Sequence, residues 1–183
     1  MTPVIILAGG KSSRMGTDKT RLLYSGETLL ERAVRRSSPR FEVLVSANRD
    51  MGIGDVRIIN DVFPGLGPIS GLHAALGEFE SVFLLAADMP FACPEAAALI
   101  IEAGSGHAVC AAVSDNRPEP LFAYYTDAVM PLIKDSIETG DYSLHRLFKT
   151  GAKLVPTASD ILMNINRPED YEKLKSHIEL GKT

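Results

Sequence analysis

Residues 3–19 read PVIILAGGKSSRMGTDK, an apolar run of strand character that passes directly into a glycine pair and a cation-rich loop. Glycine has no Cβ, so the backbone N–H groups of Gly9 and Gly10 can approach a ligand closely. Successive N–H donors form a concavity that binds anions, and flanking cations add full charge. Within eleven positions of a chain whose net charge is -4 stand Lys11, Arg14, Lys19 and Arg21. The segment therefore predicts a strand that ends in a phosphate-binding loop, rather than an ordinary surface connection.

Two well-known phosphate loops do not fit this segment. A Walker-type loop needs a glycine five residues before the Gly of its Gly-Lys-Ser/Thr triplet, but Ile5 stands five residues before Gly10. The dinucleotide pattern G-x-G-x-x-G is also missing here. The loop instead resembles the opening motif of Rossmann-like nucleotidyltransferases, L-A-[GA]-G-x-x-x-R-M-G-x-x-K. Its LAGG variant, followed by KSSRMGTDK, is most similar to the molybdenum cofactor guanylyltransferase family.

Length and composition predict a single domain, residues 1–183, with a small-molecule partner. A chain of 183 residues can bury one core but is short for two domains. No apolar run reaches the roughly 20 residues of a membrane span, and no secretory h-region opens the chain. A pI near 5.6 argues against a nucleic-acid footprint. We therefore expect a cytoplasmic protein that binds neither membrane nor nucleic acid, with Cys93 and Cys110 buried and reduced.

Strand-like and helix-like segments alternate along the chain. Strands are expected at 3–8, 42–47, 56–59, 81–87, 107–113, 121–125 and 153–155. Helices are expected at 28–38, 69–79, 94–103, 127–138, 143–149 and 168–179. Such alternation predicts βαβ units and an α/β fold whose mostly parallel sheet has helices on both faces. The resemblance makes this the three-layer, Rossmann-like nucleotidyltransferase fold.

One acidic residue follows directly after a buried strand. In open α/β sheets, ligands bind beyond the C-terminal ends of the strands, where Asp88 follows the run at 81–87. Pro90 keeps the chain extended, so Asp88 can point into the crevice instead of serving only as a turn or cap residue. Mg²⁺ prefers oxygen ligands and usually retains phosphate oxygens, which makes Asp88 a candidate metal ligand, with Mn²⁺ as the alternative ion. Asp88 also stands where the resembled family has its metal-binding Asp.

The resemblance implies further nucleotide contacts at the ends of neighbouring strands. The nucleotide-binding residues that it implies are Leu7, Ala8, Gly9, Gly10, Lys19, Ser46, Asp61 and Asp88. Asp61 stands where the family's Asp contacts guanine, and a carboxylate suits the N1–H and N2–H donors of that base. Ser46 replaces an Asn that often fixes the base or ribose, and it reaches less far. Asn48 has a structural role in this interpretation, and residues 65–71 form a turn and a helix start at Pro68 rather than a phosphate loop.

The acceptor side is expected near the C-terminus. Residues 164–170, NINRPED, resemble a family segment that closes the site against molybdopterin. Asn164 and Asn166 are spaced to point to one face and offer both donors and acceptors. Arg167 replaces a capping threonine, so either it supplies charge for the anionic cofactor or Asn166 caps the helix. The run 117–123 resembles the family's segment beside the acceptor cleft.

The resemblance implies transfer of GMP from GTP to the terminal phosphate of molybdopterin, with loss of pyrophosphate. That phosphate is already ionised, so catalysis depends on positioning and charge neutralisation rather than on a general base. The catalytic residues would be Lys19, Arg14 and Asp88, and the acceptor-binding residues Lys11, Asn164 and Asn166.

Three alternative functions stay open. A cytidylyltransferase acts on the same pterin, but its motif more often reads L-A-A-G where this chain has Gly9. A sugar-1-phosphate nucleotidyltransferase shares the opening motif in a generally longer chain. A non-catalytic nucleotide- or cofactor-binding carrier could lose Lys19 or Asp88, and both are present. Transient contact with cofactor-donating or molybdoenzyme-maturation proteins is the protein partnership that the resemblance implies.

Overall fold

The computed structural model describes residues 1–8 and 21–180. Its strands are β1 Val4–Leu7, β2 Leu23–Tyr24, β3 Glu27–Thr28, β4 Val43–Ser46, β5 Arg57–Ile59, β6 Ser81–Ala86, β7 Val109–Ser114, β8 Arg117–Thr126 and β9 Lys153–Pro156. Its helices are α1 Leu29–Ser37, α2 Pro68–Leu76, α3 Pro94–Ala103, α4 Met130–Thr139 and α5 Pro168–Leu180, with the 3-10 helices η2 Asp127–Val129 and η3 Leu144–Thr150. No helix of the described residues is both long and apolar enough to cross a membrane.

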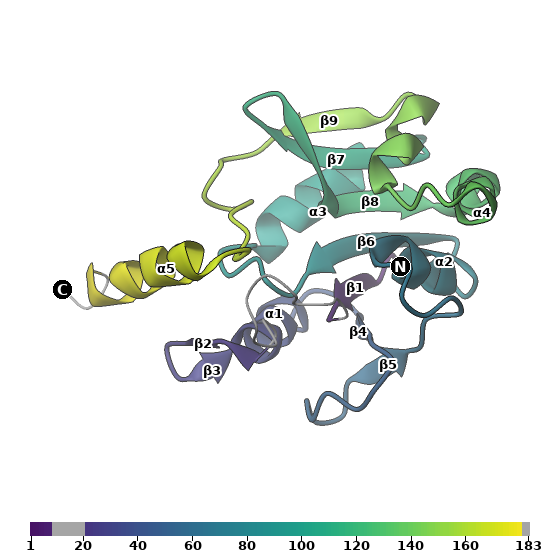
Figure 1. Cartoon of the computed structure of the whole chain (residues 1–183). Helices are drawn as coiled ribbons and strands as arrows, with labels where there is room; N and C mark the ends of the chain where they lie inside the picture. Colours follow the sequence, from purple (N-terminus) through teal and green to yellow (C-terminus); the bar gives the residue numbers. More distant parts are fainter. Residues whose placement is uncertain (9–20, 181–183) are drawn as a thin grey trace.

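A seven-stranded sheet in the order β5-β4-β1-β6-β8-β7-β9 forms the middle layer (Figure 1). The pairs β5–β4, β4–β1, β1–β6 and β7–β9 are parallel. Strand β8 is antiparallel to both of its neighbours, β6 and β7. The prediction of a mostly parallel sheet is therefore confirmed.

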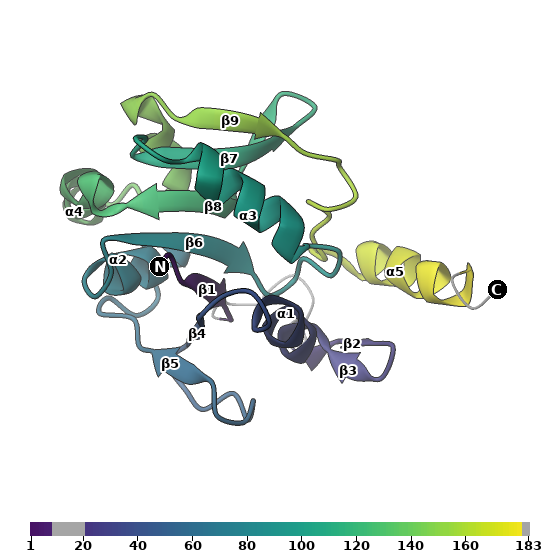
Figure 2. The same ribbon diagram turned by 180° about the vertical axis from the view of Figure 1, so that it is seen from behind.

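The two faces of the sheet are buried against different helices. Ile6, on one face, belongs to a core that includes Leu30 of α1 and Ile100 of α3. Its neighbour Ile5, on the other face, belongs to a core that includes Leu72 of α2 and Ile133 of α4. Successive strand residues point to opposite faces, so a strand covered on both sides is apolar throughout, as VIIL is and as β6 is after Ser81. Figure 2 shows α1 and α3 in front of the sheet and α2 behind it.

Strand β8 is longer than the sequence predicted. The expected strand at 121–125 begins at Arg117, and the turn is only Asp115-Asn116, whose φ values of 50° and 58° are left-handed. The sequence Asp115-Asn116-Arg117-Pro118 had predicted a longer turn. Pro118 is instead paired with Val113, and Pro120 lies where the β7–β8 register shifts between Ala111 and Ala112.

A small β2–β3 hairpin was missed. Its turn is Ser25-Gly26, with φ values of 53° and 88°, which is turn chemistry that the sequence displayed. The hairpin leads into α1, and a capping box in which Thr28 and Glu31 bond each other's backbone N–H starts that helix. The Tyr171 hydroxyl of α5 donates to the Leu23 carbonyl at 2.8 Å, so the last helix lies beside the hairpin. The helix expected at 143–149 is also present, but as the 3-10 helix η3.

Candidate active site

The C-terminal ends of the first parallel strands meet at one edge of the sheet. Leu7 of β1 is in register with Ser46 of β4 and with Ala86 of β6. The Ala8 N–H then donates to the Ser46 carbonyl at 3.1 Å, and the Ala87 N–H donates to the Leu7 carbonyl at 3.2 Å. The predicted residues Leu7, Ala8, Ser46, Asp61 and Asp88 therefore follow or end neighbouring strands at this edge, as expected for an open α/β sheet.

Asp61 is held by the end of the neighbouring strand. Its carboxylate accepts the Ser46 hydroxyl at 3.1 Å and the Asn48 side-chain amide at 2.9 Å. Its backbone N–H donates to the Asn48 Oδ1 at 2.9 Å, which closes a reciprocal pair. Asn48 therefore has the structural role predicted for it, which is to hold Asp61 in place through these two bonds. Ser46 is buried and serves Asp61 too, and the nucleotide contact expected of it stays a prediction.

Helix α2 approaches this edge closely through a glycine. A Cβ on Gly71 would lie 2.5 Å from the Ser46 Oγ and 2.7 Å from the Leu7 Cδ2. Only glycine therefore lets α2 cover the end of the sheet without displacing the side chain that bonds Asp61. The predicted turn and helix start at Pro68 are confirmed, with Gly67 at a φ of 78° before it.

Asp88 is half-buried and lies just beyond β6. Its carbonyl accepts the Ile165 N–H at 2.9 Å, although the two residues are far apart in sequence. This bond places the segment that carries Asn164 and Asn166 directly beside the residue after β6. The structure therefore brings the predicted metal ligand and the predicted acceptor segment together.

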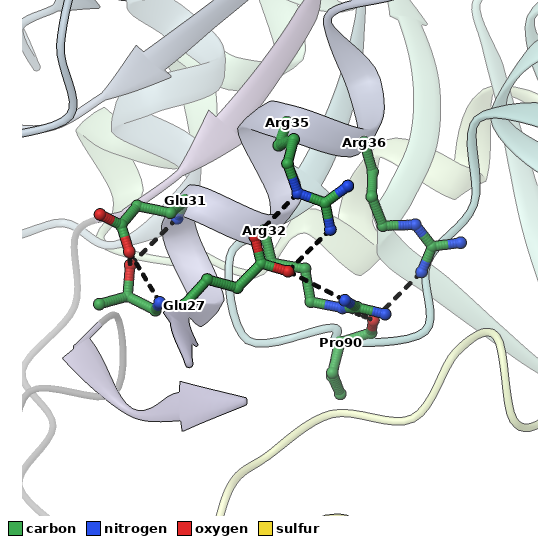
Figure 3. Close-up of polar contacts among 7 residues, drawn as sticks. Glu27, Glu31, Arg32, Arg35, Arg36 and Pro90 are labelled. Carbon is green, nitrogen blue, oxygen red and sulfur yellow. Dashed lines mark hydrogen bonds and ion pairs between the residues drawn. The ribbon is translucent and has the colours of Figure 1, made fainter. Parts of the chain in front are cut away.

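Two arginines of α1 hold the loop that follows Asp88 (Figure 3). The Arg32 Nε–H donates to the Pro90 carbonyl at 2.9 Å, and the Arg36 Nη1 donates to the same oxygen at 3.3 Å. Glu27 of β3 accepts the Arg32 Nη1 at 3.0 Å and the Arg35 Nη2 at 2.7 Å. The hydrogen bond from Arg35 is the main reason that the pKa of Glu27 falls to about 2.

We call the arginines Arg32, Arg35 and Arg36 together with Glu27 the clamp. Aromatic contacts add to it. The Arg32 guanidinium lies 4.5 Å from the centre of the Tyr24 ring, and Tyr24 meets Phe91 edge-to-face with ring centres 6.0 Å apart. The hairpin that the sequence did not predict thus supplies both Tyr24 and Glu27. Neither the clamp nor Arg32 was found from the sequence, since nothing local marks an arginine whose partner is a distant carbonyl.

Glu119 adds a carboxyl group to the acceptor side. It accepts the Leu121 N–H at 3.0 Å and the Asn164 Nδ2 at 3.1 Å. Burial is the main cause that raises the pKa of Glu119; the two hydrogen bonds oppose the rise, and the charge of Asp88 adds to it. The sequence had placed this residue in the segment beside the acceptor cleft but had given it no role.

The start of α5 resolves the question of its cap. The backbone N–H groups of Asn166 and Arg167 both donate to the Asp170 Oδ2, at 3.0 Å and 2.9 Å. Asp170 therefore stabilises the helix start, a hydrogen-bonding role that the sequence analysis had not given it. The acceptor contacts of Asn164, Asn166 and Arg167 stay predictions.

Five predicted site residues lie outside the described residues: Gly9, Gly10, Lys11, Arg14 and Lys19. Among residues 1–8 and 21–180, no group of three or more His, Cys, Asp or Glu side chains could hold a metal ion. A single carboxylate such as Asp88 at the strand ends suits Mg²⁺, which is usually bound by one or two carboxylates together with substrate phosphates and water. Cys93 and Cys110 are free thiols; Cys110 is buried as expected, whereas Cys93 is only half-buried.

A mostly parallel α/β sheet with acids after the carboxyl ends of its strands is the arrangement typical of a Rossmann-like nucleotide-binding protein. Comparison with known proteins makes this more specific. The model of the MobA-like NTP transferase domain matches residues 4–173. The chain therefore belongs to the MobA-like NTP transferase family, and it is a nucleotidyltransferase.

Individual relatives agree with this assignment. A probable molybdenum cofactor guanylyltransferase of Pelotomaculum thermopropionicum is 31% identical over 98% of this chain and 94% of the relative. A molybdenum cofactor guanylyltransferase of Rhizobium johnstonii is 31% identical over 96% and 92%. The crystal structure of molybdopterin-guanine dinucleotide biosynthesis protein A from Archaeoglobus fulgidus superposes with a TM-score of 0.86 at 26% identity, covering 97% of this chain and 99% of that one. The predicted family resemblance and fold are thereby confirmed.

Proposed function

We propose that this protein transfers GMP from GTP to the terminal phosphate of molybdopterin and releases pyrophosphate. An oxygen of the pterin phosphate bonds to the α-phosphorus of GTP. The bond from that phosphorus to the bridging oxygen of the β-phosphate breaks, and pyrophosphate leaves with the electron pair. The observation that carries this proposal is the bond from Ile165 to Asp88, because it puts residues 164–166, the proposed acceptor side, next to the strand ends where the nucleotide is proposed to bind.

Family membership and the two relatives that are 31% identical over nearly their whole length support the choice of substrates. Asp61 supports the choice of base, since its carboxylate is an acceptor suited to the N1–H and N2–H donors of guanine. Both Asp61 oxygens are already oriented by Ser46 and Asn48, and a carboxylate has further lone pairs for a ligand. This preorganisation is what recognition of one base requires.

The remaining roles follow from charge. Nucleotidyltransferases of this kind generally use a divalent metal, and Asp88 would hold Mg²⁺, or Mn²⁺ in its place. When bound, the ion supplies positive charge that neutralises the phosphate oxygens. Lys19 would neutralise charge on the reacting phosphates, Arg14 would steady the triphosphate, and Lys11 would attract the incoming pterin phosphate. We further infer that the protein acts in the cytoplasm and meets proteins that donate the cofactor or mature molybdoenzymes only transiently.

The decisive experiment incubates the purified protein with Mg²⁺, molybdopterin and each labelled nucleoside triphosphate in turn, and identifies the product. We expect molybdopterin guanine dinucleotide from GTP and almost no product from CTP or ATP. Asp88→Ala should lower turnover by at least ~100-fold, the size of effect seen when a positioned electrostatic group is removed. Asp127→Ala, an exposed acid in η2, is the matched control and should leave turnover unchanged.

Other outcomes would contradict the proposal in different ways. A cytosine dinucleotide would indicate the cytidylyltransferase alternative. Tight binding of GTP without any product would indicate a nucleotide- or cofactor-binding carrier. Activity only with a sugar 1-phosphate would place the chain among the sugar nucleotidyltransferases.

A further inference from the structure

Glu119 stands at an irregular point of β8. It lies between Pro118 and Pro120, where the ladder with β7 shifts register. Its Oε1 accepts the Leu121 N–H at 3.0 Å, so one carboxylate oxygen is held by the backbone. Its Oε2 accepts the Asn164 Nδ2 at 3.1 Å, across 45 residues of sequence. The carboxylate therefore connects β8 to the segment that precedes α5.

The Asn164 side chain has a defined amide orientation. Its Nδ2 donates to Glu119 and also, at 3.3 Å, to the Leu162 carbonyl. A backbone carbonyl can only accept, at any pH, so the nitrogen and not the oxygen must face Leu162. Both Nδ2 hydrogens are then used, and within the part of the chain that the structure describes Asn164 Oδ1 has no hydrogen-bond partner.

The same amide lies next to the candidate active site. Ile165, the residue after Asn164, is bonded through its N–H to the Asp88 carbonyl at 2.9 Å. Asn164 is half-buried, so it is neither sealed in the core nor a fully solvated surface residue. A ligand that reaches it beside Asp88 meets a hydrogen-bond acceptor, because the donor end of the amide is occupied.

We propose that Glu119 is a positioning residue that determines acceptor specificity. It holds the Asn164 amide with the nitrogen inward, so that Asn164 offers only its oxygen and selects a hydrogen-bond donor on the acceptor substrate. For a pterin the donor would be a ring N–H or an amino group. This inference rests on the proposed function for the identity of that substrate, and on the hydrogen bonds of Glu119 and Asn164 for the direction of selection.

A glutamine at position 119 separates this role from one of simple packing. Glutamine has one oxygen, and the Leu121 N–H, a fixed donor, requires it. The glutamine NH₂ would then face the Asn164 Nδ2, and two donors would meet. Either that hydrogen bond is lost or the Asn164 amide turns over, which brings its oxygen against the Leu162 carbonyl. In both cases the acceptor substrate no longer meets an ordered oxygen.

The test compares wild type, Glu119→Gln, Asn164→Ala and the double variant Glu119→Gln/Asn164→Asp. In the double variant the glutamine NH₂ can donate to one oxygen of the new carboxylate, and the second oxygen is available to the ligand. The first oxygen now faces the Leu162 carbonyl, so the rescue is only partial. We expect Glu119→Gln and Asn164→Ala to raise the KM for molybdopterin about tenfold with the KM for GTP unchanged, and the double variant to recover part of that loss. Glu102→Gln, a change of the same kind on α3, is the matched control and should behave as wild type.

A second readout does not depend on catalysis. The side-chain NH₂ of Asn164, assigned in ¹H–¹⁵N spectra, should exchange slowly in wild type and fast or at a changed shift in Glu119→Gln. An unchanged Asn164 signal, or an unchanged KM for molybdopterin, would overturn the inference. If wild type makes no dinucleotide, the proposed function fails, while the NH₂ signal still decides the amide orientation. If Glu119→Gln does not fold, the double variant decides the matter. A KM for molybdopterin as high as that of Asn164→Ala overturns the inference, and a KM lower than that of Asn164→Ala supports it.

Discussion

Asp61 illustrates how single residues are prepared for recognition in this protein. Its carboxylate accepts from Ser46 and Asn48, and its N–H donates back to Asn48. A side chain with two such bonds, on a backbone held by a third, loses little conformational freedom when a ligand binds, because that freedom has already been lost in folding. Ser46, an apparent departure from the resembled family, is thereby explained as part of the support of Asp61.

The first prediction concerns the base that Asp61 recognises. Asp61→Ala should weaken GTP binding by roughly 1–3 kcal/mol, because the guanine N1–H and N2–H donors lose their partner in a partly desolvated site. CTP and ATP, which lack this donor pair, should be affected much less. Equilibrium binding of the three nucleotides measures the difference. Asn48→Ala is the control, since it removes a support of Asp61 but leaves the carboxylate, and should cause a smaller loss with the preference for GTP kept. An equal loss for all three nucleotides would mean that Asp61 only shapes its loop.

Among the elements, α1 acts on the active site from outside it. Two of its three arginines, Arg32 and Arg36, bond the Pro90 carbonyl, two residues after Asp88. The β2–β3 hairpin holds Arg32 through Glu27 and Tyr24. The Arg32 side chain is only 17% exposed, whereas that of Arg35 is 63% exposed. Arg32 is thus a sheltered arginine that contacts the loop, as Arg36 also does, whereas the exposed Arg35 bonds only Glu27.

A matched pair of substitutions tests the clamp. Arg32→Ala should lower kcat about tenfold, because the loop that carries Asp88 loses a charge-assisted hydrogen bond and its position with it. Arg35→Ala, on the same helix, should change kcat by less than about twofold, because exposed ion pairs contribute little. Arg32→Lys should not restore activity, since an ammonium cannot reproduce the planar fork that reaches Glu27 and Pro90 together. Comparable losses in the two alanine variants, measured under steady-state conditions, would contradict a specific role for Arg32.

Helix α2 gives the third prediction. Gly71→Ala should destabilise the protein by about 1–2 kcal/mol, because overpacking against Ser46 and Leu7 outweighs the better helix propensity of alanine. Gly77→Ala is the control: the new Cβ would lie 3.3 Å from the nearest atom, the Ala74 carbonyl oxygen, and stability should change little. Urea unfolding of both variants measures these free energies. If Gly71→Ala were as stable as wild type, α2 would not be packed against the strand ends as tightly as the structure has it.

For the molecule as a whole, the sheet is built from two parts that meet at the active site. Strands β5, β4, β1 and β6 are parallel and bring the nucleotide-side residues to one edge. The antiparallel β8 then carries Glu119 past the end of β6, where Leu85 pairs with Phe122, and toward Asn164. Asp88 lies between the two parts. In the proposed function, donor and acceptor substrates would therefore bind on opposite sides of the Asp88 carboxylate.

Global stability should also respond to the clamp through pH. The pKa of Glu27 is about 2 in the folded protein, against 4.5 as its ordinary value. A carboxyl group whose pKa is lower in the folded than in the unfolded protein stabilises the fold when it is ionised. The contribution of Glu27 to the unfolding free energy should therefore be fully present above about pH 4.5 and be lost as the pH falls toward 2. Its size should be about 1–2 kcal/mol, reduced by the solvent around Arg35. The measurement is the difference in unfolding free energy between wild type and Glu27→Gln from pH 6 to the lowest pH at which both fold.

A control on an exposed pair sharpens this measurement. Glu172 pairs with Lys175 on α5, and the two side chains are 69% and 47% exposed. Glu172→Gln should therefore differ from wild type by almost the same amount at every pH. A difference for Glu27→Gln that is equally flat would mean that the Glu27 carboxylate does not gain its charge stabilisation from Arg32 and Arg35.

Most elements could be predicted because their signals are local. The apolar runs of β1 and β6 indicate strands buried on both faces, and Pro68 and Pro94 mark the first turns of α2 and α3. The extent of β8 could not be predicted, because two prolines that argue against a strand are accommodated by an irregular ladder with β7. Asp61 and Asp88 could be nominated from their places after strands, since the ends of parallel strands share one edge.

The sequence by itself determined the nucleotide-binding class of this protein, the family and the acids after β5 and β6, because each of these depends on residues that are neighbours in the chain. Only the tertiary structure decided how those acids are held. The partner of Glu119 is 45 residues away, and the partner of Arg32 is 58 residues away. Such bonds form only after the sheet has brought β8, α1 and the segment before α5 to the same edge, and no local pattern records them.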